Sequence, residues 1–142
     1  MIVAVLDTNV LVSGFPARGG VSATLVDAWR QGAYHLVVSE PILDELAETW
    51  RDPYWQARFS PTASEAAITL LRAAAIMASL TIEVTGVATH PEDDLILATA
   101  VAGEASYLVT GDRKLRAVAA FQDITILTPR EFLARLQSEA PA

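Results

Sequence analysis

The chain has 142 residues, of which 52% are apolar, and a formal net charge of −7 at pH 7. This length and apolar content are typical of one globular domain with a well-filled core, and they exclude a disordered chain. The absence of cysteine excludes disulfides, thiolate metal sites and cysteine nucleophiles, and the acidic balance disfavours nucleic-acid binding by charge alone. No apolar run reaches the roughly 20 residues of a membrane span, so we expect a cytoplasmic protein that does not enter a membrane.

Short apolar runs alternate with helical patterns along the whole chain. The runs lack polar alternation, as is typical of parallel strands covered on both faces. We therefore expect a three-layer α/β/α sandwich around a five-stranded parallel sheet, formed by a single domain over residues 1–138 with a short tail at 139–142. The predicted strands are 2–6, 35–38, 80–84, 106–109 and 124–127, and the predicted helices are 21–31, 41–51, 63–79, 92–103, 113–121 and 129–137.

Two helix starts carry a capping-box pattern, in which a hydroxyl residue precedes a glutamate by three positions. Thr128 and Glu131 show it around a proline suited to a first helical turn, and Thr62 and Glu65 repeat the spacing. These signals fix where the last and the third predicted helices should begin.

The first predicted strand ends on a carboxylate, Asp7. A buried and unpaired carboxylate costs several kcal/mol, so such groups are usually paired, hydrogen-bonded or bound to a metal ion. Asp112 follows a later strand in the stretch YLVTGD, and the carboxyl ends of parallel strands share one edge of a sheet. Each residue taken alone is equally consistent with a helix cap.

Two further acids come from helices. Asp94 opens an almost wholly apolar helix and shares its face with Ala98 and Val101, whereas Asp93 lies about 100° away and is the competing candidate. On the helix ILDELAETW, Glu45 and its neighbour Asp44 border the apolar stripe, and a solvated surface position is the plain alternative for both. A convergent set of acids would repel itself without a cation, and hard oxygen ligands suit Mg²⁺ or Mn²⁺. We expect Asp7 to share such an ion.

Three stretches, VLDTNVLVSG, LVVSEPILDELAETW and PEDDLILATAVAGEASYLVTGD, resemble successive blocks of the PIN-domain family, and most closely its VapC-like ribonuclease toxins. The resemblance runs from residue 2 to about residue 136. It implies a metal-dependent endoribonuclease that uses Mg²⁺ or Mn²⁺ to hydrolyse RNA, and a homodimer blocked by a cognate antitoxin protein. The family's four acids fall on the metal-binding and catalytic candidates Asp7, Glu45, Asp94 and Asp112. Its flanking polar residues, taken as substrate-binding candidates, fall on Asn9, Ser39 and Thr110.

The sequence departs from the family pattern after Asp112. Many relatives carry another acid shortly after the Gly-Asp pair, but this chain continues with Arg113 and Lys114. These cations disfavour a second metal ion there, and they are candidates to hold a substrate phosphate. A single ion is the simpler expectation, and neither histidine is needed for it.

The stretch WRDPYWQARF interleaves aromatic and basic side chains. It could stack bases of RNA, but a hydrophobic interface with another helix or a protein partner is the preferred interpretation. For the chain as a whole, the alternative to an enzyme is a non-catalytic PIN-like module that binds RNA or protein. A haloacid-dehalogenase-like phosphatase would need an acid two residues after Asp7, where Asn9 stands.

Overall fold

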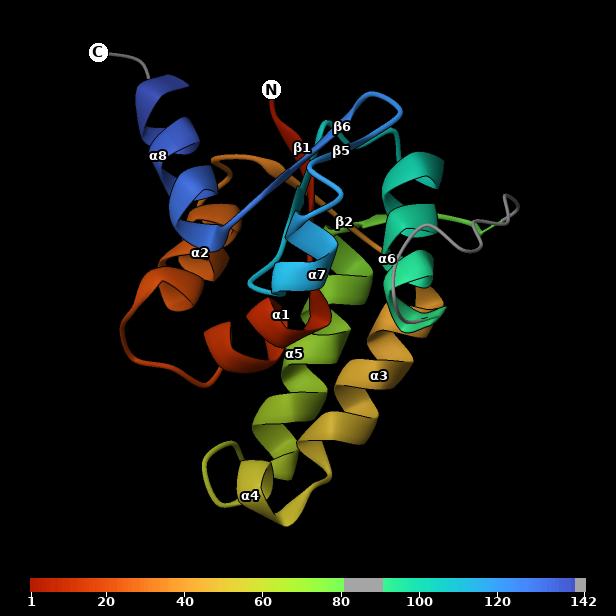
Figure 1. Ribbon diagram of the computed structural model, residues 1–142. Helices are drawn as coiled ribbons and strands as arrows, with labels where there is room; N and C mark the ends of the chain where they lie inside the picture. Colours follow the sequence, from red (N-terminus) through yellow and green to blue (C-terminus); the bar gives the residue numbers. More distant parts are fainter. Residues whose placement is uncertain (81–90, 140–142) are drawn as a thin grey trace.

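The structure is a computed structural model that describes residues 1–80 and 91–139, with only the backbone described at 91–93 and 114 (Figure 1). Helices and strands alternate along most of the chain. Their order and bounds are β1 (Val3–Leu6), α1 (Thr8–Gly14), α2 (Val21–Arg30), β2 (His35–Val38), α3 (Glu40–Trp50), α4 (Pro53–Gln56), α5 (Pro61–Ala74), β3 (Ile76–Met77), α6 (Pro91–Ala102), β4 (Tyr107–Val109), α7 (Arg113–Arg116), β5 (Ala120–Phe121), β6 (Ile124–Leu127) and α8 (Pro129–Glu139).

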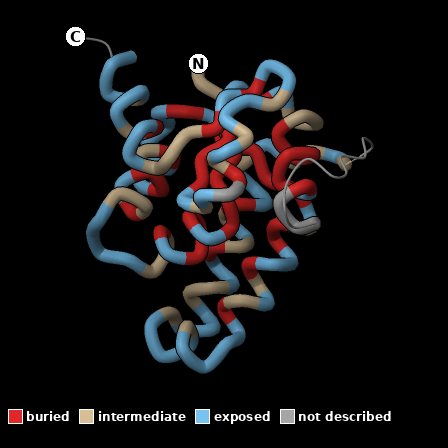
Figure 2. The backbone as a smooth tube through the Cα atoms, in the orientation of Figure 1, coloured by how far each residue is buried: buried red, intermediate tan, exposed pale blue. Residues whose placement is uncertain are grey.

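The strands form one sheet in the order β3-β2-β1-β4-β6-β5. β1 lies near the middle, parallel to both β2 and β4, and its residues Ala4, Val5 and Leu6 are fully buried. This placement explains why the first strand has no polar alternation. In Figure 1, α2 and α8 lie on one side of the strands and α6 lies on the other, which confirms the expected α/β/α sandwich. Figure 2 shows the buried backbone concentrated in the strands between these helices.

The expectation of a five-stranded, fully parallel sheet is wrong in two respects, the number of strands and the direction of one of them. The described sheet has six strands, and β5 runs antiparallel to β6, with Phe121 opposite Ile124. Ala119 and Gln122 adopt left-handed backbone conformations, with φ of 61° and 53°, which turn the chain back on itself. The helix predicted over 113–121 therefore ends at Arg116, because the following residues pair with the sheet edge.

The long helix predicted over 63–79 is also shorter than expected. It ends at Ala74, and Ala75 is extended, so that Ile76 and Met77 pair in parallel with Val37 and Val38 of β2. The exposed edge of β2 thereby gains backbone hydrogen bonds that a continued helix could not supply. The strand predicted at 80–84 lies outside the described residues except for its first residue.

The capping box at the last helix is confirmed. The Glu131 N–H donates to Thr128 Oγ1 at 3.0 Å, and the Thr128 N–H donates to Glu131 Oε1 at 2.9 Å. Hydrogen bonds from the backbone N–H and the side chain of Thr128 to the Glu131 carboxyl hold the pKa of that carboxyl below its ordinary value. The second predicted box is wrong, because α5 begins at Pro61 and Ser60 Oγ caps it by accepting from the Ala63 N–H.

Within the described part of the chain, no helix has the length and apolar character needed to cross a membrane.

Candidate active site

Asp7 stands at the carboxyl end of the central strand and is almost completely buried, with 5% of its surface exposed. Its backbone N–H donates to the Val109 carbonyl at 2.8 Å, which extends the β1–β4 pairing by one residue. The Thr110 hydroxyl donates to Asp7 Oδ2 at 2.6 Å. Residues 103 positions apart in the chain thus meet at one edge of the sheet, as the strand-end pattern predicts for Asp7 and its neighbours on β4.

Burial raises the pKa of the Asp7 carboxyl above its ordinary value, because it disfavours the charged form. The hydrogen bond from Thr110 and the backbone N–H groups of Thr8 and Asn9 act in the opposite direction, and the negative charge of Asp112 adds to the increase. The net effect is a carboxyl whose negative charge is disfavoured in the metal-free protein. A bound cation would offset both the burial and the repulsion from Asp112.

Thr110 links the two strand-end acids. Its Oγ1 donates to Asp7 and accepts the N–H of Asp112 at 3.0 Å. Asp112 is half-buried and precedes α7, where its Oδ1 accepts the Leu115 N–H at 3.4 Å. Thr110, a predicted substrate-binding residue, therefore holds Asp7 and Asp112 in their relative positions.

Thr8 links Glu45 to the end of the sheet where Asp7 lies. Its place in the sequence does not predict a functional role for Thr8. The Thr8 hydroxyl donates to Glu45 Oε2 at 3.2 Å, and Thr8 itself is buried. This bond connects α1, which begins directly after Asp7, to α3, on which Glu45 is exposed. The only signal in the sequence is a hydroxyl residue next to Asp7, which is too common to identify a role.

Asp94 lies in the first turn of α6 and has 8% of its surface exposed, whereas the following residue, Leu95, is 44% exposed. The acid therefore faces the protein and the leucine faces solvent. α6 packs against β1, β2 and β4. The side chain of Asp93, its competitor, is not described, and His90 lies outside the described residues.

The remaining predicted residues differ in their access to solvent. Asn9, two residues after Asp7, and Arg113, one residue after Asp112, are exposed, and the side chain of Lys114 is not described. Ser39 is fully buried at the end of β2. His35 is exposed at the opposite end of that strand, away from the acids.

The chemistry of the four acids suits a hard divalent cation, because every donor is a carboxylate oxygen and Asp7 and Asp112 repel each other without one. Among the side chains that the structure describes, no group of three or more aspartate, glutamate or histidine residues lies close enough together to hold a metal ion. The structure thus brings Asp7, Thr110 and Asp112 into direct contact or close charge interaction. Glu45 is linked to this end of the sheet through Thr8. Asp94 lies in the first turn of α6, beyond the point where Thr99 of that helix meets the end of β2.

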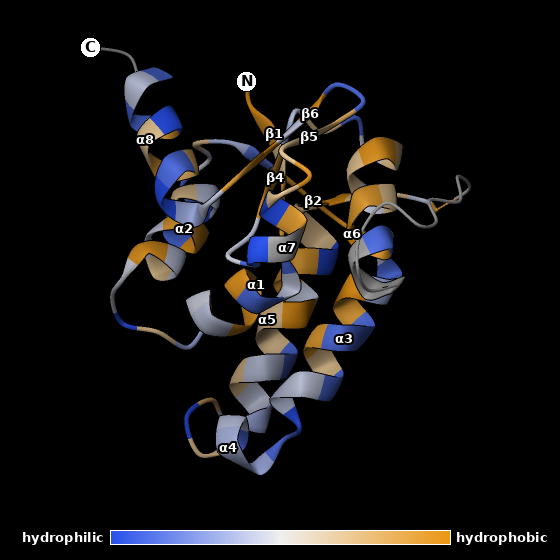
Figure 3. Cartoon of the chain, viewed as in Figure 1, coloured by the Kyte–Doolittle hydropathy of each residue, from blue (hydrophilic) through white to orange (hydrophobic). Residues whose placement is uncertain are grey.

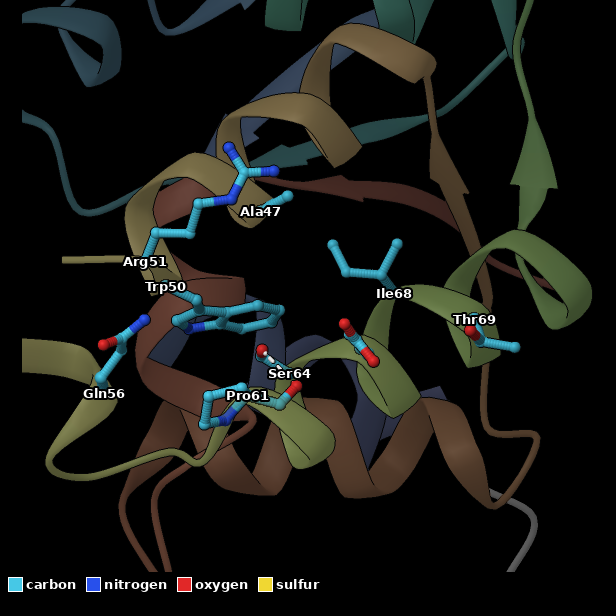
Figure 4. A pocket seen from close by; sticks show the side chains of 9 residues that line it. Ala47, Trp50, Arg51, Gln56, Pro61, Ser64, Ile68 and Thr69 are labelled. Atoms are coloured by element: carbon cyan, nitrogen blue, oxygen red, sulfur yellow. Dashed lines mark hydrogen bonds between the residues drawn. The ribbon is translucent and has the colours of Figure 1, made fainter.

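A pocket of about 390 Å³ lies away from these acids, between α3, α4 and α5 (Figure 4). Trp50 forms part of its wall, but it is 2% exposed, and its indole N–H donates to the Val12 carbonyl at 3.3 Å. Trp50 also makes edge contacts with Phe15 and Phe59. Its role in the aromatic-basic stretch is therefore to pack α3 against α1.

The exposed aromatic residue of that stretch is Tyr54, at 55% exposure. The Arg58 guanidinium lies 3.6 Å from the centre of its ring and donates to the Tyr54 carbonyl at 2.7 Å. One face of the ring is thus covered within the chain.

Comparison with known proteins agrees with this fold. A family model described as PIN domain matches residues 3–114, a range that includes all four acids. No curated protein matches the chain significantly. Among solved structures, the chain is similar to the crystal structure of FitAcB from Neisseria gonorrhoeae, with 16% sequence identity and a TM-score of 0.53, over 89% of this chain and 98% of that chain. At this identity the likeness concerns the fold alone. Because the family model covers most of its length, the chain belongs to the PIN-domain family.

Proposed function

We propose that this protein is a metal-dependent endoribonuclease that hydrolyses phosphodiester bonds of RNA. The observation that carries the proposal is the buried Asp7 at the carboxyl end of the central strand, bonded to Thr110 and close to the like-charged Asp112. A protein gains nothing in stability from burying a carboxylate beside another one. The arrangement is explained if a divalent cation supplies the missing positive charge.

Asp7, Asp94 and Asp112 would hold Mg²⁺ or Mn²⁺, with Glu45 acting directly or through the water around the ion. When bound, such an ion lowers the pKa of a coordinated water and polarises a phosphate oxygen. The Thr110 and Thr8 hydroxyls orient Asp7 and Glu45. Asn9, Arg113 and Lys114 are the candidates to contact the RNA, since two of them are exposed beside the acids.

The proposal extends to biological context: a VapC-like toxin that acts in the cytoplasm as a homodimer and is blocked by a cognate antitoxin protein. The resemblance of three sequence blocks to that branch and the membership of the PIN-domain family support it. Expression in a bacterial host should arrest growth, Asp7→Asn should remove the arrest, and co-expression of the antitoxin should relieve it. Growth arrest that persists with Asp7→Asn would argue against a toxin that acts by cleavage.

The second candidate function is a non-catalytic module that binds RNA or protein. The observation that favours it is that no three of the described acids lie close enough together to hold an ion. Chelator-treated protein incubated with single-stranded RNA and then with Mn²⁺ separates the two functions. We expect cleavage that starts on addition of Mn²⁺ and is absent in Asp7→Asn.

Two matched variants serve as controls in this assay. Asp27→Asn removes an exposed carboxylate from α2, and Glu48→Gln removes one from α3 that lies close in sequence to Glu45. Both should cleave at the wild-type rate. Cleavage that continues in chelator, or that survives in Asp7→Asn, would contradict the nuclease assignment.

A further inference from the structure

Two fully buried hydroxyl groups join the sheet to α6. Ser39 follows the last residue of β2, Thr99 lies in the middle of α6, and their oxygens are 2.8 Å apart. Hydroxyls buried without partners are costly, so this bond strongly favours the arrangement in which the two meet.

The direction of this bond follows from a third group. The Thr99 hydroxyl donates to the Leu95 carbonyl at 2.9 Å. A hydroxyl has one hydrogen, so Ser39 is the donor to Thr99. The chain of bonds runs from the end of β2 through Thr99 to Leu95, which is the residue next to Asp94.

A second contact lies further along the same two elements. A Cβ placed on Gly103, which follows the last residue of α6, would come within 2.4 Å of Val37 Cγ1. Thr99 and Gly103 are four residues apart on one helix face, a rise of about 6 Å, and Val37 and Ser39 are two residues apart on one strand face, about 6.6 Å. The two spacings agree, so α6 lies along β2 in a register that brings Thr99 to Ser39 and Gly103 to Val37.

The pattern of apolar residues in α6 does not by itself specify how the helix is rotated about its own axis. Figure 3 shows the helix hydrophobic along most of its length, with its hydrophilic residues in the first turn. A helix that is apolar on nearly all sides has no single hydrophobic stripe that selects one face for the sheet. A rotation would, however, separate the Ser39 and Thr99 hydroxyls, so that the Ser39 hydroxyl would lose its partner and Thr99 would keep only its bond to the Leu95 carbonyl.

We propose that Ser39 and Thr99 form a positioning pair, which fixes the rotation of α6 and thereby the direction in which Asp94 points. The inference rests on the proposed metal-dependent function, in which Asp94 is a ligand. In this proposal Ser39 helps to position Asp94, and it is not the substrate contact that the family resemblance implied. Its buried oxygen and its bond to Thr99 carry this assignment.

The test compares Thr99→Val, which keeps the shape and removes the hydroxyl, with Thr99→Ser, which restores it. Mn²⁺ affinity is measured by titration calorimetry without RNA, and kcat and KM are measured by RNA cleavage. We expect Thr99→Val and Ser39→Ala to weaken Mn²⁺ binding about tenfold or more, as removal of groups that orient metal ligands typically does, with KM for RNA unchanged. Thr99→Ser should bind Mn²⁺ as the wild type does. The double variant should be no worse than Thr99→Val alone, because both changes break one bond.

Thr24→Val is the matched control, because the Thr24 hydroxyl also donates to the carbonyl four residues earlier, that of Gly20, on the exposed surface of α2. It should leave Mn²⁺ affinity unchanged. Wild-type affinity in both Thr99→Val and Ser39→Ala would overturn the proposal. So would a raised KM with unchanged Mn²⁺ affinity in Ser39→Ala, because it would make Ser39 a substrate contact.

An NMR measurement separates failure of this inference from failure of the proposed function. If the wild type binds no Mn²⁺ and cleaves no RNA, the proposed function fails. The backbone amide shifts of Asp94 and Leu95 then decide the positioning role. Shifts that move in Thr99→Val and return in Thr99→Ser support it, and shifts that stay unchanged in every variant overturn it. Thr99→Ser and Ser39→Ala also keep the test decisive if Thr99→Val does not fold.

Discussion

Replacing Asp7 by asparagine should stabilise the metal-free protein at neutral pH, although the change removes a side chain central to the proposed chemistry. Asparagine keeps the shape, and its amide oxygen can still accept the Thr110 hydroxyl. The weaker neutral hydrogen bond costs about 1 kcal/mol, whereas removal of a buried charge returns several kcal/mol. We expect a net gain of about 1–3 kcal/mol in the free energy of unfolding, or roughly 4 °C in Tm for each kcal/mol.

The pH dependence of this gain has a definite sign. Burial raises the pKa of Asp7 in the folded state above its ordinary value of 3.8. The stability that the protonated carboxyl gives the wild type is therefore fully present below pH 3.8, and it is lost as the pH rises through the higher folded pKa. The variant should exceed the wild type most above that folded pKa, and the difference should shrink toward acid pH.

Urea unfolding of both proteins across this pH range, in EDTA and in excess Mg²⁺, measures these effects. Mg²⁺ at about 100 times its dissociation constant should add about 2.7 kcal/mol to the wild type and little to the variant. In Mg²⁺ the stability advantage of the variant over the wild type should therefore shrink or reverse. A variant that is less stable than the wild type in EDTA at pH 7 would refute the reasoning, because it would mean that the charged carboxyl is satisfied without a cation.

Three further outcomes follow from the site. Asp94→Ala should lower the cleavage rate by orders of magnitude and Asp93→Ala should lower it little, because successive residues of a helix differ in direction by about 100° and Asp94 is the one in phase with Ala98 and Val101. Paired rate measurements check this, and the reverse ranking would exchange the two assignments. Arg113→Ala combined with Lys114→Ala should weaken binding to all RNA sequences alike and reduce the slope of log K against log salt by about 0.7 for each RNA phosphate that these side chains neutralise. An unchanged slope, measured with a non-hydrolysable RNA in Mg²⁺, would place both residues on the solvated surface. Calcium should bind but support little cleavage, because its longer and more flexible coordination activates water less well; cleavage in Ca²⁺ at the Mg²⁺ rate would contradict this.

Much of the fold can be predicted from short stretches of the sequence. The apolar run before Asp7 lacks alternation because β1 is covered on both faces, and this property can be read from a few consecutive residues. The capping box at Thr128 is likewise a local pattern, and it predicts the start of α8 correctly. Prediction is poorest at 113–121, where a helix-like pattern gives way to β5, since the sheet edge offered by β6 is a non-local partner.

The apolar runs show which residues end the parallel strands, and this pattern is enough to place Asp7 and the 110–112 segment at one edge of the sheet. The tertiary structure decided which side chains meet there: Thr110 on Asp7, Thr8 on Glu45, and Ser39 on Thr99. These partners are 103, 37 and 60 residues apart in the chain. The physical reason is that a helix turns its side chains by about 100° per residue, so a contact depends on the rotation of each packed helix. For α6, whose surface is apolar on nearly all sides, no sequence period specifies that rotation, and its contacts with the sheet, the Ser39–Thr99 bond among them, decide it.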